Sequence, residues 1–590
     1  AAPKDPADLY TRMAYVRENH WKLTHLLNYN QTFYKHDIGM LLGFEEERFV
    51  KRTTDTAKLG LIDSSVGDSS SATTPSSIGG TGEEFTSRSY FGRINYAFDS
   101  RYLFEVNMRY DGSSRFAPDN RWGLFPSFSA GWRISEERFM KGLPIDNLKL
   151  RASWGKLGNN AIGNYEWQAV YNSAKYAFGG SLNNGLAITS ISNNLLEWES
   201  TAITNIGIDF ATLRNRLTFE AEFYNKVTDG ILYRPDMYMS LGTASGPRQN
   251  IAEVTNRGIE MTLNWQDRIG KVEYRVSGNF AYNQNKVSKY KGELQRGWVT
   301  DENGNRVYQT NIGDVSTGGF TRVIEGKMIN EYYMLQPYKG NGNGFNADGT
   351  VNINGGPRDG MIRTVDDMKW LNAMVGAGYK FYPRQNVSKS GIWYGDYIYA
   401  DLNGDGVYGN DADNEFQGCS NVPKYNFGLQ ASANWKGFDF SMNWSGAAGF
   451  KIYYYRLALN SSATIKGYAI GEAIANDHYF FDPKNPNDPR TNLSSKNPRL
   501  TNNSGNDQSG MTQSSVHLQK GDYIKLKNLT IGYTLPAVLS KKVYAQNIRF
   551  FASGENLFTI TGYEGMDPEM RTAVGYSTMR QYAFGVNITF

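Results

Sequence analysis

The feature that most constrains this chain is an alternation of apolar and polar residues in stretches of about ten residues, the length of one tilted membrane-crossing strand. Residues 102–111 place Tyr102, Phe104, Val106, Met108 and Tyr110 on one side of a strand and Glu105, Asn107, Arg109 and Asp111 on the other. A charged side is costly in the dry core of a β-sandwich, but it suits a water-filled lumen. The pattern therefore predicts strands of a β-barrel in a membrane.

The alternation recurs along the chain. It is found in residues 148–154, 217–223, 259–265, 425–435, 438–444 and 582–590. The pair Lys436-Gly437, between two of these stretches, predicts a tight hairpin turn. In total we expect roughly 15 antiparallel strands. The alternation predicts how many strands there are, but it does not predict the residues at which each begins and ends.

The expected connections between the strands are unequal in length. Short turns such as residues 99–101 alternate with long polar segments at residues 55–84, 288–395 and 450–513. Barrels of the outer membrane have short periplasmic turns and long external loops. The sequence therefore predicts a long extracellular loop at 288–395, followed by an acidic loop at 396–418.

The composition agrees with a barrel and excludes several other classes of protein. Aromatic residues make up 14% of the 590 residues and 62 residues are glycine, which suits many strands joined by turns. No window holds the ~20 apolar residues of a membrane-spanning helix, so any crossing must be made by strands. Cys419 is the single cysteine, which excludes an internal disulfide. A net charge of +4 without a basic stripe gives no nucleic-acid footprint.

Several short segments stand out along the chain as local motifs. They are residues 109–116 (RYDGSSRF), 125–127 (FPS), 131–133 (GWR), 150–155 (LRASWG), 224–228 (YNKVT), 256–260 (NRGIE), 526–536 (LKNLTIGYTLP), 555–558 (ENLF) and 567–569 (DPE). In sequence and in order, these segments resemble the SusC-like branch of the TonB-dependent transporters of Bacteroidetes. The resemblance implies an all-β, transmembrane antiparallel barrel of the 22-stranded type, filled by an N-terminal plug.

The resemblance also implies that the chain is a partial barrel. Residues 1–590 would form the later part of the barrel domain, without the plug and beginning partway round the barrel. The N-terminus, Ala1-Ala2-Pro3-Lys4, has no secretory signal, which an exported protein needs. We therefore expect the sequence to start inside a longer precursor.

The function implied by the resemblance is import of a nutrient, an oligosaccharide or an oligopeptide, across the outer membrane together with a SusD-like surface lipoprotein. The sequence contains no phosphate-binding loop of the Walker type. The energy would therefore come from the TonB-ExbB-ExbD complex, acting through the missing N-terminal part. Transport itself requires no cofactor, and outer-membrane lipid and the nutrient are the other expected partners.

The sharpest local motif is an acidic, glycine-containing segment that begins at Asp396. Its residues are spaced as in a calcium loop, and the candidate ligands are Asp401, Asn403, Asp405, the Val407 backbone, Asp411 and Asp413. The twelfth position is Ala412 rather than Glu, and one extra residue shifts the closing carboxylate to Asp413. We predict a structural Ca²⁺ that stiffens the loop, and the open alternative is an acidic turn without metal.

Aromatic residues crowd the long loop, and exposed rings can stack on sugar faces or pack against peptides. The candidates for substrate binding are Trp298, Tyr332, Tyr333, Trp393 and Tyr394. The alternative is that these rings hold the long loops together. The last strand contains Tyr582, Phe584 and Phe590, and in similar barrels a final aromatic strand is an insertion signal.

No enzymatic activity is predicted, because the five histidines are dispersed and the chain has no nucleophile-elbow motif.

Two rival interpretations, an adhesin and a porin, stay open beside import. A secreted or surface-attached all-β adhesin that binds glycan would have apolar inner faces and shielded edges. A passive porin would share the barrel but not the family's energised mechanism.

Overall fold

The computed structural model describes most of the chain. The described residues are 9–61, 65, 67–233, 247–290, 294–300, 306–313, 321–322, 324–382, 386–454, 472–500, 514–571 and 576–590, with the backbone alone for 189–190, 290, 294–300, 306–313, 321–322 and 473. The chain divides into two compact units. The first comprises residues 1–212 and 222–255, and the second comprises residues 213–221 and 256–590.

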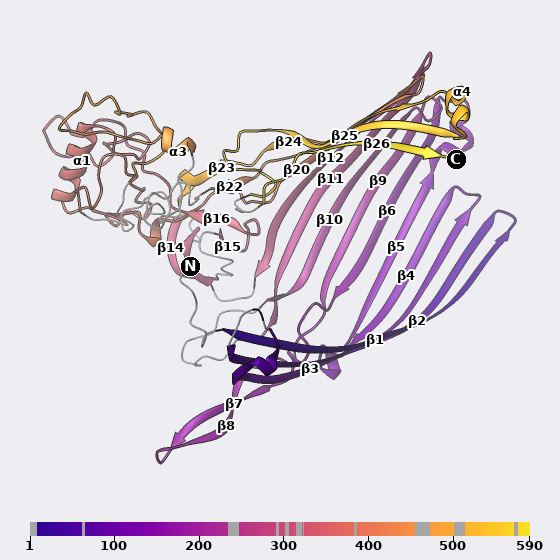
Figure 1. The fold of residues 1–590 in the computed structure, drawn as a ribbon, viewed down its shortest axis with the longest axis horizontal. Helices are drawn as coiled ribbons and strands as arrows, with labels where there is room; N and C mark the ends of the chain where they lie inside the picture. The colour runs from indigo at the N-terminus through magenta and orange to yellow at the C-terminus, as the bar shows by residue number, and fades with distance from the viewer. Residues whose placement is uncertain are drawn as a thin grey trace. The chain divides into compact units, whose positions relative to one another are not determined.

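One antiparallel sheet of 15 strands dominates the structure (Figure 1). Its strands in spatial order are β1 (Tyr10–Phe33), β2 (His36–Leu61), β3 (Ala72–Phe98), β4 (Tyr102–Ser113), β5 (Trp122–Arg133), β6 (Ile145–Asn159), β9 (Glu199–Thr212), β10 (Leu217–Tyr233), β11 (Gln249–Ile269), β12 (Val272–Tyr290), β20 (Tyr425–Trp435), β21 (Phe438–Ala448), β24 (Tyr523–Thr534), β25 (Asn547–Thr561) and β26 (Gln581–Thr589). The sheet confirms the predicted all-β class and the predicted number of barrel strands.

The tight turn predicted between two of these strands is confirmed. β20 and β21 join through Lys436 and Gly437, whose φ angles are 48° and 91°. A type I′ turn has positive φ at both of its central positions. It is favoured in two-residue hairpin loops because its backbone twist matches that of the strands. The sequence signal at this hairpin was therefore sufficient to fix its geometry.

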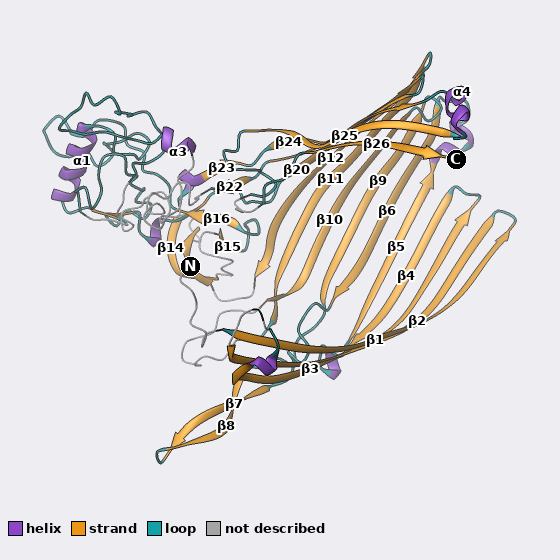
Figure 2. Ribbon diagram, viewed as in Figure 1, coloured by secondary structure: helices purple, strands orange, loops and turns teal. Residues whose placement is uncertain are grey.

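The remaining elements are short and lie outside the main sheet (Figure 2). The strands are β7 (Val170–Phe178), β8 (Ser181–Ser190), β13 (Leu294–Thr300), β14 (Arg306–Gly313), β15 (Thr321–Arg322), β16 (Glu331–Met334), β17 (Lys380–Phe381), β18 (Val407–Tyr408), β19 (Glu415–Phe416), β22 (Lys451–Tyr453) and β23 (Leu518–Lys520). The helices are α1 (Val365–Gly376), α3 (Glu472–Asn476) and α4 (Ala537–Ser540). Within the described residues, no helix combines the length and the apolar character needed to span a bilayer.

The alternation seen in the sequence separates the two faces of β4. On one face Phe104 and Met108 are each 49% exposed, whereas Glu105 and Asn107 on the other face are half-buried. The register extends the apolar face to the neighbouring strands, where one cross-strand row consists of Ile94, Val106, Phe128 and Trp154. Large apolar side chains on an exposed face are what a lipid-facing surface requires.

Aromatic rings bound this apolar face at two levels. Near one end of β4, Tyr102 stacks with Phe98 and Trp132 at centroid distances of 6.4 and 6.5 Å. Near the other end, Trp122 stacks on Tyr110 at 4.8 Å. Tyr102 and Tyr110 lie about 26 Å apart along a strand that rises ~3.3 Å per residue. This separation matches the scale of the apolar band of an outer-membrane barrel, which is flanked by aromatic girdles.

The connections alternate between short and long along the sheet. At one end of the strands, the short-connection end, the chain turns within residues 34–35, 99–101, 134–144, 213–216, 270–271, 436–437 and 535–546. At the other, the long-connection end, the strands are joined by residues 62–71, 114–121, 160–198, 234–248, 291–424, 449–522 and 562–580. Because barrels of the outer membrane have short periplasmic turns and long external loops, the short-connection end faces the periplasm.

The polar loop predicted at residues 55–84 is wrong. β2 continues to Leu61 and β3 begins at Ala72, and Asp55 pairs with Gly79 across the two strands. This segment is rich in Ser, Thr and Gly, which favour turns. The ladder of backbone hydrogen bonds to β2 nevertheless keeps it extended, because tertiary pairing overrides weak intrinsic propensity in strands.

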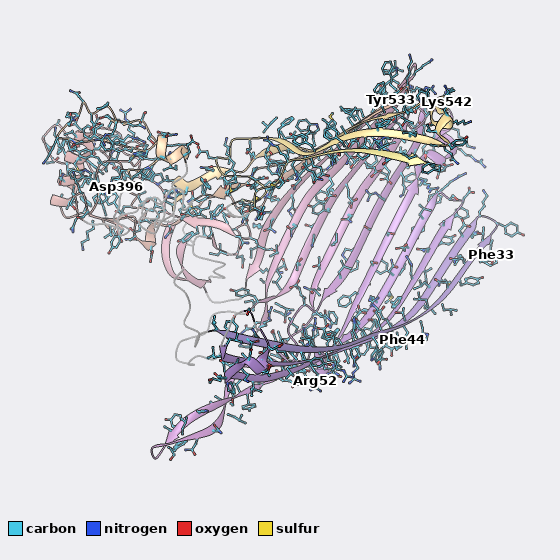
Figure 3. The ribbon with its side chains drawn as sticks, in the orientation of Figure 1. Phe33, Phe44, Arg52, Asp396, Tyr533 and Lys542 are labelled. Carbon is cyan, nitrogen blue, oxygen red and sulfur yellow. The ribbon has the colours of Figure 1, made fainter. Side chains whose placement is uncertain are left out.

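The strand β2 leaves the apolar band at Phe44, which Figure 3 labels together with Phe33 and Arg52. The three residues after Phe44 are Glu45, Glu46 and Glu47. On one face Lys22 pairs with Glu45 at 2.9 Å, and on the other Arg88 pairs with Glu46 at 3.1 Å. Charged side chains thus lie on both faces at this level, which indicates that this part of β1 to β3 extends beyond the band on the long-connection side.

The long connections of the second unit fold into a compact body, which we call the loop module. It comprises the described residues of 324–424 and 472–500. Its buried core contains aromatic residues from several segments, including Trp370, Phe381, Tyr399, Tyr408 and Tyr479. α1 begins with a capping box between Thr364 and Asp367, which satisfies the first free N–H groups of the helix. Residues from both the 288–395 and the 396–418 segments thus share one hydrophobic core.

Candidate functional site

The polar face of the sheet carries paired charges in the first unit. Arg151 on β6 donates from Nε to Asp209 on β9 at 3.0 Å and from Nη1 to Glu222 on β10. Lys149 lies 3.3 Å from the same Asp209. Each of these cations has an anion within reach, so the face can line a water-filled space without leaving partly buried charges unpaired.

A cavity of about 580 Å³ lies against this polar face. It is lined by residues of β1 to β6 and β9, among them Asn30, Gly39, Asn95, Glu105 and Arg151. These are the side chains that the alternation assigns to the lumen. The cavity therefore belongs to the inner surface of the barrel wall.

In the second unit the polar face anchors one of the long connections. Arg549 on β25 donates to both oxygens of Asp439 on β21, at 2.8 and 2.6 Å. Lys525 on β24 is buried, and its Nζ lies 2.7 Å from Asp567 Oδ2 and 2.8 Å from Glu569 Oε2. Asp567 and Glu569 follow β25, so this cluster holds the connection between β25 and β26 against the wall.

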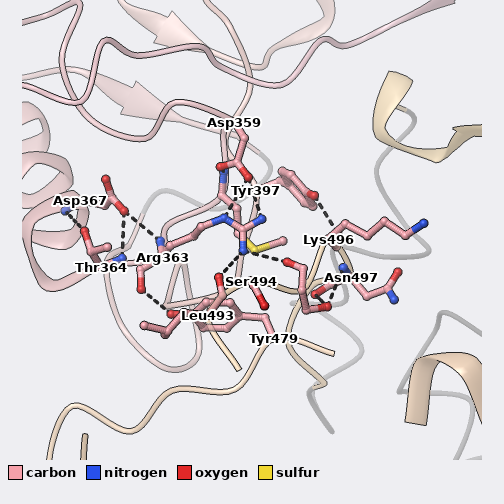
Figure 4. Close-up of polar contacts among 12 residues, drawn as sticks. Asp359, Arg363, Thr364, Asp367, Tyr397, Tyr479, Leu493, Ser494, Lys496 and Asn497 are labelled. Atoms are coloured by element: carbon pink, nitrogen blue, oxygen red, sulfur yellow. Dashed lines mark hydrogen bonds and ion pairs between the residues drawn. The ribbon is translucent and has the colours of Figure 1, made fainter. Parts of the chain in front are cut away.

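Arg363 joins the two chain segments of the loop module (Figure 4). Its guanidinium donates to Asp359 Oδ2 at 2.8 and 2.6 Å, and its Nη1 donates to the carbonyl oxygens of Leu493 and Ser495, both at 2.7 Å. Its own carbonyl oxygen accepts a hydrogen bond from the Tyr479 hydroxyl. One side chain thus ties residues 472–500 to the start of α1.

Asp396 and Arg499 form a buried ion pair in the same module. Arg499 donates from Nε and Nη2 to the two oxygens of Asp396 at 2.8 and 2.9 Å, and Asp396 is 1% exposed. Asp396 also accepts a hydrogen bond from the backbone N–H of Trp393 at 2.8 Å. Burial raises the pKa of Asp396, and the Arg499 guanidinium opposes that shift. The pair therefore fixes the backbone that presents Trp393.

A pocket of about 720 Å³ lies next to this ion pair. Trp393, Tyr394 and Phe481 form an aromatic wall, with centroid distances of 5.2 Å from Trp393 to Tyr394 and 5.0 Å from Tyr394 to Phe481. The polar groups that line the pocket include Lys389, His478, Arg490 and Asn492. A concave site of this size, with aromatic walls and a few polar groups, is typical of a small-ligand pocket.

Two of the five predicted substrate-binding residues, Trp393 and Tyr394, meet in this pocket. The expectation of exposed rings does not hold for Tyr394, which is 5% exposed, nor for Tyr332 and Tyr333 on β16, which are 3% and 5% exposed. The Tyr332 hydroxyl donates to the Lys451 carbonyl at 3.1 Å, and burial raises the pKa of Tyr332 to about 12. Tyr332 and Tyr333 therefore pack the loops together. The fifth residue, Trp298, lies in β13, and its side chain is outside the described residues.

Most of the pocket residues were missed by the sequence analysis, among them Phe480, Phe481 and Arg490. The Arg490 guanidinium lies 4.6 Å from the Phe480 ring centroid and is held by Asp488 at 2.8 Å. The available signal was the aromatic run Tyr479-Phe480-Phe481, which stands out in an otherwise polar stretch. It was overlooked because the whole of 450–513 was treated as a polar loop.

The candidate calcium loop is folded by its own carboxylates. Asp401 accepts hydrogen bonds from the N–H groups of Gly404 and Gly406 at 2.7 and 2.9 Å. Asp413 is fully buried and accepts three backbone N–H groups at 2.7 to 3.0 Å. Burial raises the pKa of Asp413 to about 6, against the effect of these hydrogen bonds.

The other candidate ligands also make bonds within the loop. Asn403 accepts the N–H of Asp405 at 3.0 Å, and Asp405 accepts the N–H of Val407 at 2.8 Å. Asp411 begins the 3₁₀ turn Asp411–Asp413. Among the residues that the structure describes, no group of three His, Cys, Asp or Glu side chains is placed to hold a metal ion. Calcium binding here stays a prediction.

The last strand presents its aromatic residues to the outside. Tyr582, Phe584 and Phe590 are all largely exposed on or next to β26. We expect that Phe590→Ala in the full-length protein lowers the amount assembled in the outer membrane several-fold, because the aromatic residues of this strand would be read as an insertion signal. Heat-modifiability of the protein in isolated outer membranes measures assembly. Phe590→Tyr is the control, and normal assembly of Phe590→Ala would contradict the prediction.

Comparison with known proteins agrees with this geometry. Residues 5–557 match the family described as TonB dependent receptor-like, beta-barrel. The chain is 30% identical over 601 residues to a TonB-dependent receptor of Formosa agariphila, covering 95% of this chain and 52% of that protein. It is 28% identical over 517 residues to the TonB-dependent receptor SusC of Bacteroides thetaiotaomicron, covering 85% and 43%. The chain spans about half the length of the curated relatives it matches.

Solved structures with the same fold include the RagAB peptide transporter. That structure superposes with a TM-score of 0.73 at 21% identity, covering 98% of this chain and 56% of that chain. The closed-closed state of the RagAB peptide importer gives a TM-score of 0.72. The likeness establishes the fold. With the family match across nearly the whole chain and the lipid-facing band on its sheet, it places this chain in the outer membrane, as a SusC-like member of the TonB-dependent receptor β-barrel family.

Proposed function

We propose that this chain is part of an importer that carries a nutrient across the outer membrane and draws its energy from TonB. The family match over residues 5–557 is the observation that carries the proposal. The paired charges on the polar face of the sheet support it, because a solute path through a barrel needs a hydrated wall. TonB-ExbB-ExbD would act through parts of the protein outside this chain.

The cargo class of the proposed importer is an oligosaccharide or an oligopeptide. The peptide alternative is supported by the RagAB likeness, since RagAB is a peptide transporter. The aromatic pocket of about 720 Å³ in the loop module has room for a short segment of either polymer. Trp393 and Tyr394 are the residues we expect to contact it.

A SusD-like surface lipoprotein is the proposed partner on the outside. The SusC relative and the RagAB fold support this pairing. The loop module and the long connections would supply the contact surface, because they are the parts that extend beyond the apolar band on the external side. Capture outside the membrane and passage through the barrel would then be divided between two proteins.

The experiment that tests the proposal is copurification of the full-length native protein from detergent-solubilised outer membranes. Mass spectrometry of the purified material should show a SusD-like lipoprotein in stoichiometric amount and a retained ligand that names the cargo. A protein found only in the soluble fraction would contradict the proposal. It would favour the glycan-binding adhesin instead.

We also propose a structural Ca²⁺ in the loop at residues 401–413. Asp401, Asn403 and Asp405 already turn the chain as in a calcium loop. At about 1 mM free Ca²⁺, a level at which extracellular calcium modules bind, the module should gain about 0.4–1.4 kcal/mol against local unfolding. Protease resistance of the full-length protein with Ca²⁺ and with a chelator measures this gain.

The matched variants for the calcium prediction are Asp401→Asn and Asp348→Asn. Asp401→Asn should abolish the response to Ca²⁺, whereas Asp348→Asn should keep it, because Asp348 forms a similar polar turn with Thr350 elsewhere in the module. A module whose resistance is the same with Ca²⁺ and with chelator would leave the segment as an acidic turn.

A further inference from the structure

The short connections of the second unit carry only positive charge. Residues 213–216, 270–271, 436–437 and 535–546 contain the cations Arg214, Arg216, Lys271, Lys436, Lys541 and Lys542 and no Asp or Glu. The whole chain contains 62 Lys and Arg residues and 58 Asp and Glu residues, so the excess of positive charge in these connections is local. A concentration of one sign at one end of the strands attracts an anionic surface.

Most of these cations are not neutralised by the protein. Arg216 pairs with Asp267 at 3.0 Å. The other acids of these strand ends, Glu273 and Asp439, lie 3.6 Å from Arg268 and 2.6 Å from Arg549. Lys271, Lys541 and Lys542 are exposed, and within the described residues their side chains make no ion pair or hydrogen bond. Their charge is therefore available to a partner outside the chain.

The same segment exposes apolar side chains beside the lysines. α4 and the 3₁₀ turn Lys541–Val543 leave Val538 and Val543 exposed at 74% and 58%. Ser540 and Ala545 turn inward and are buried, so the segment is fixed to the protein while its apolar side chains remain outside. An apolar surface with lysines beside it is the pattern of elements that lie in the interface of a membrane.

The backbone at Tyr544 supports this interpretation. Tyr544 has a φ of 58° and is 92% exposed. A residue with a β-carbon in the left-handed region carries strain on the order of 1 kcal/mol or more, and glycine or asparagine would relieve it. Tyr34, in the turn 34–35 of the first unit, is also in the left-handed region, with a φ of 53°, and it is fully exposed. Both rings lie at the short-connection end and contact little of the protein. They are therefore free to contact molecules outside the chain.

These connections continue directly from the lipid-facing aromatic residues. Trp435 and Phe438 flank the turn at Lys436, with ring centroids 6.2 Å apart, and Lys436 Nζ lies 5.4 Å from the Trp435 ring. Phe438 also packs against Tyr533, with ring centroids 4.5 Å apart, and Tyr533 lies three residues before Pro536. Figure 3 labels Tyr533 and Lys542. Aromatic girdles sit at headgroup level, and lysines beside them reach their ammonium groups toward the phosphates.

We propose that the short connections of the second unit form a docking surface for the anionic phospholipid headgroups of the periplasmic leaflet. Lys271, Lys541 and Lys542 would contact the phosphate groups, and Val538, Val543 and Tyr544 would enter the boundary between headgroups and acyl chains. The surface fixes the level of the barrel in the membrane. It is independent of cargo and of TonB.

Lipid binding to the full-length protein tests the proposal. Native mass spectrometry in detergent compares the affinity for phosphatidylglycerol, which is anionic, with that for phosphatidylcholine, which has no net charge. The triple variant Lys271→Gln, Lys541→Gln and Lys542→Gln should bind phosphatidylglycerol about ten-fold or more weakly, because each basic residue near an anionic surface adds to the attraction. Its affinity for phosphatidylcholine should not change.

The control is a triple variant with the same change in charge at the long-connection end, Lys175→Gln, Lys339→Gln and Lys484→Gln, three exposed lysines of the external connections. It should bind phosphatidylglycerol as the unaltered protein does. The proposal is overturned if the first triple variant keeps its affinity, or if the two lipids bind equally to the unaltered protein.

A labelling measurement separates lipid from protein as the occupant. Lys541 and Lys542 should react with a water-soluble amine reagent when the full-length protein is in detergent, and they should be protected in bilayers that contain phosphatidylglycerol. Protection already in detergent would mean that another protein segment covers the lysines. That result would overturn the lipid proposal.

Discussion

Replacing Asp396 by alanine is expected to destabilise the loop module by about 3–5 kcal/mol, the usual loss when one partner of a buried ion pair is removed. The carboxylate is 1% exposed and accepts two hydrogen bonds from Arg499 and one from the Trp393 backbone. Without it, the Arg499 guanidinium stays partly buried with no anion, and the backbone at Trp393 loses its acceptor. Hydrogen exchange of the module in the full-length protein measures the loss.

Asp366→Ala is the matched control for Asp396→Ala. Asp366 also pairs with a cation, Lys369 at 3.0 Å, but its side chain is 88% exposed. Exposed pairs contribute about 0–1 kcal/mol, so this variant should leave the exchange of the module nearly unchanged. Equal, small effects of the two variants would show that the buried pair does not hold the module together.

Replacing Phe128 by arginine is expected to destabilise the folded barrel by about 2–4 kcal/mol, the range for a basic residue on the lipid face near the bilayer midplane. Phe128 lies in the cross-strand row with Val106, which is halfway between the aromatic levels at Tyr102 and Tyr110. Its ring also stacks on Trp154 at 6.0 Å, and the substitution removes that contact. Denaturant unfolding of the full-length protein from lipid bilayers measures the change.

Two variants control for the size and the charge of the new side chain. Ser129→Arg places the same residue one position along, on the polar face opposite Glu105, where it should have little effect. Phe128→Leu keeps the lipid face apolar and should retain most of the stability. If Ser129→Arg were the more damaging of the two arginine variants, the assignment of the lipid and lumen faces would be reversed.

The strands were predictable from the sequence because their signal is local. Residues 425–435 and 438–444 alternate without interruption, and Lys436-Gly437 between them is a recognisable turn, so β20 and β21 were found near their observed bounds. Residues 72–84 failed because they have little apolar alternation. These residues form a strand only because they pair with β2, and the local amino-acid composition does not predict that pairing.

The loop module was not predictable for a different reason. Asp396 meets Arg499, and Arg363 meets Ser495, across more than a hundred residues of chain. In neither pair do the two residues belong to one local sequence motif. Such contacts depend on how the long connections fold against one another, which local sequence does not specify. The same distance explains why Trp393 and Tyr394 were identified as a pair while Phe481, the third ring of their wall, was missed.

The most direct test of the account is uptake by cells that make the full-length protein, with and without a functional TonB. The ligand that copurifies with the protein is supplied in labelled form, and the amount of protein in the outer membrane is measured in both strains. The account predicts that uptake stops without TonB while the protein remains in the membrane. Uptake that continued at the same rate would contradict energised import and would identify the barrel as a passive porin.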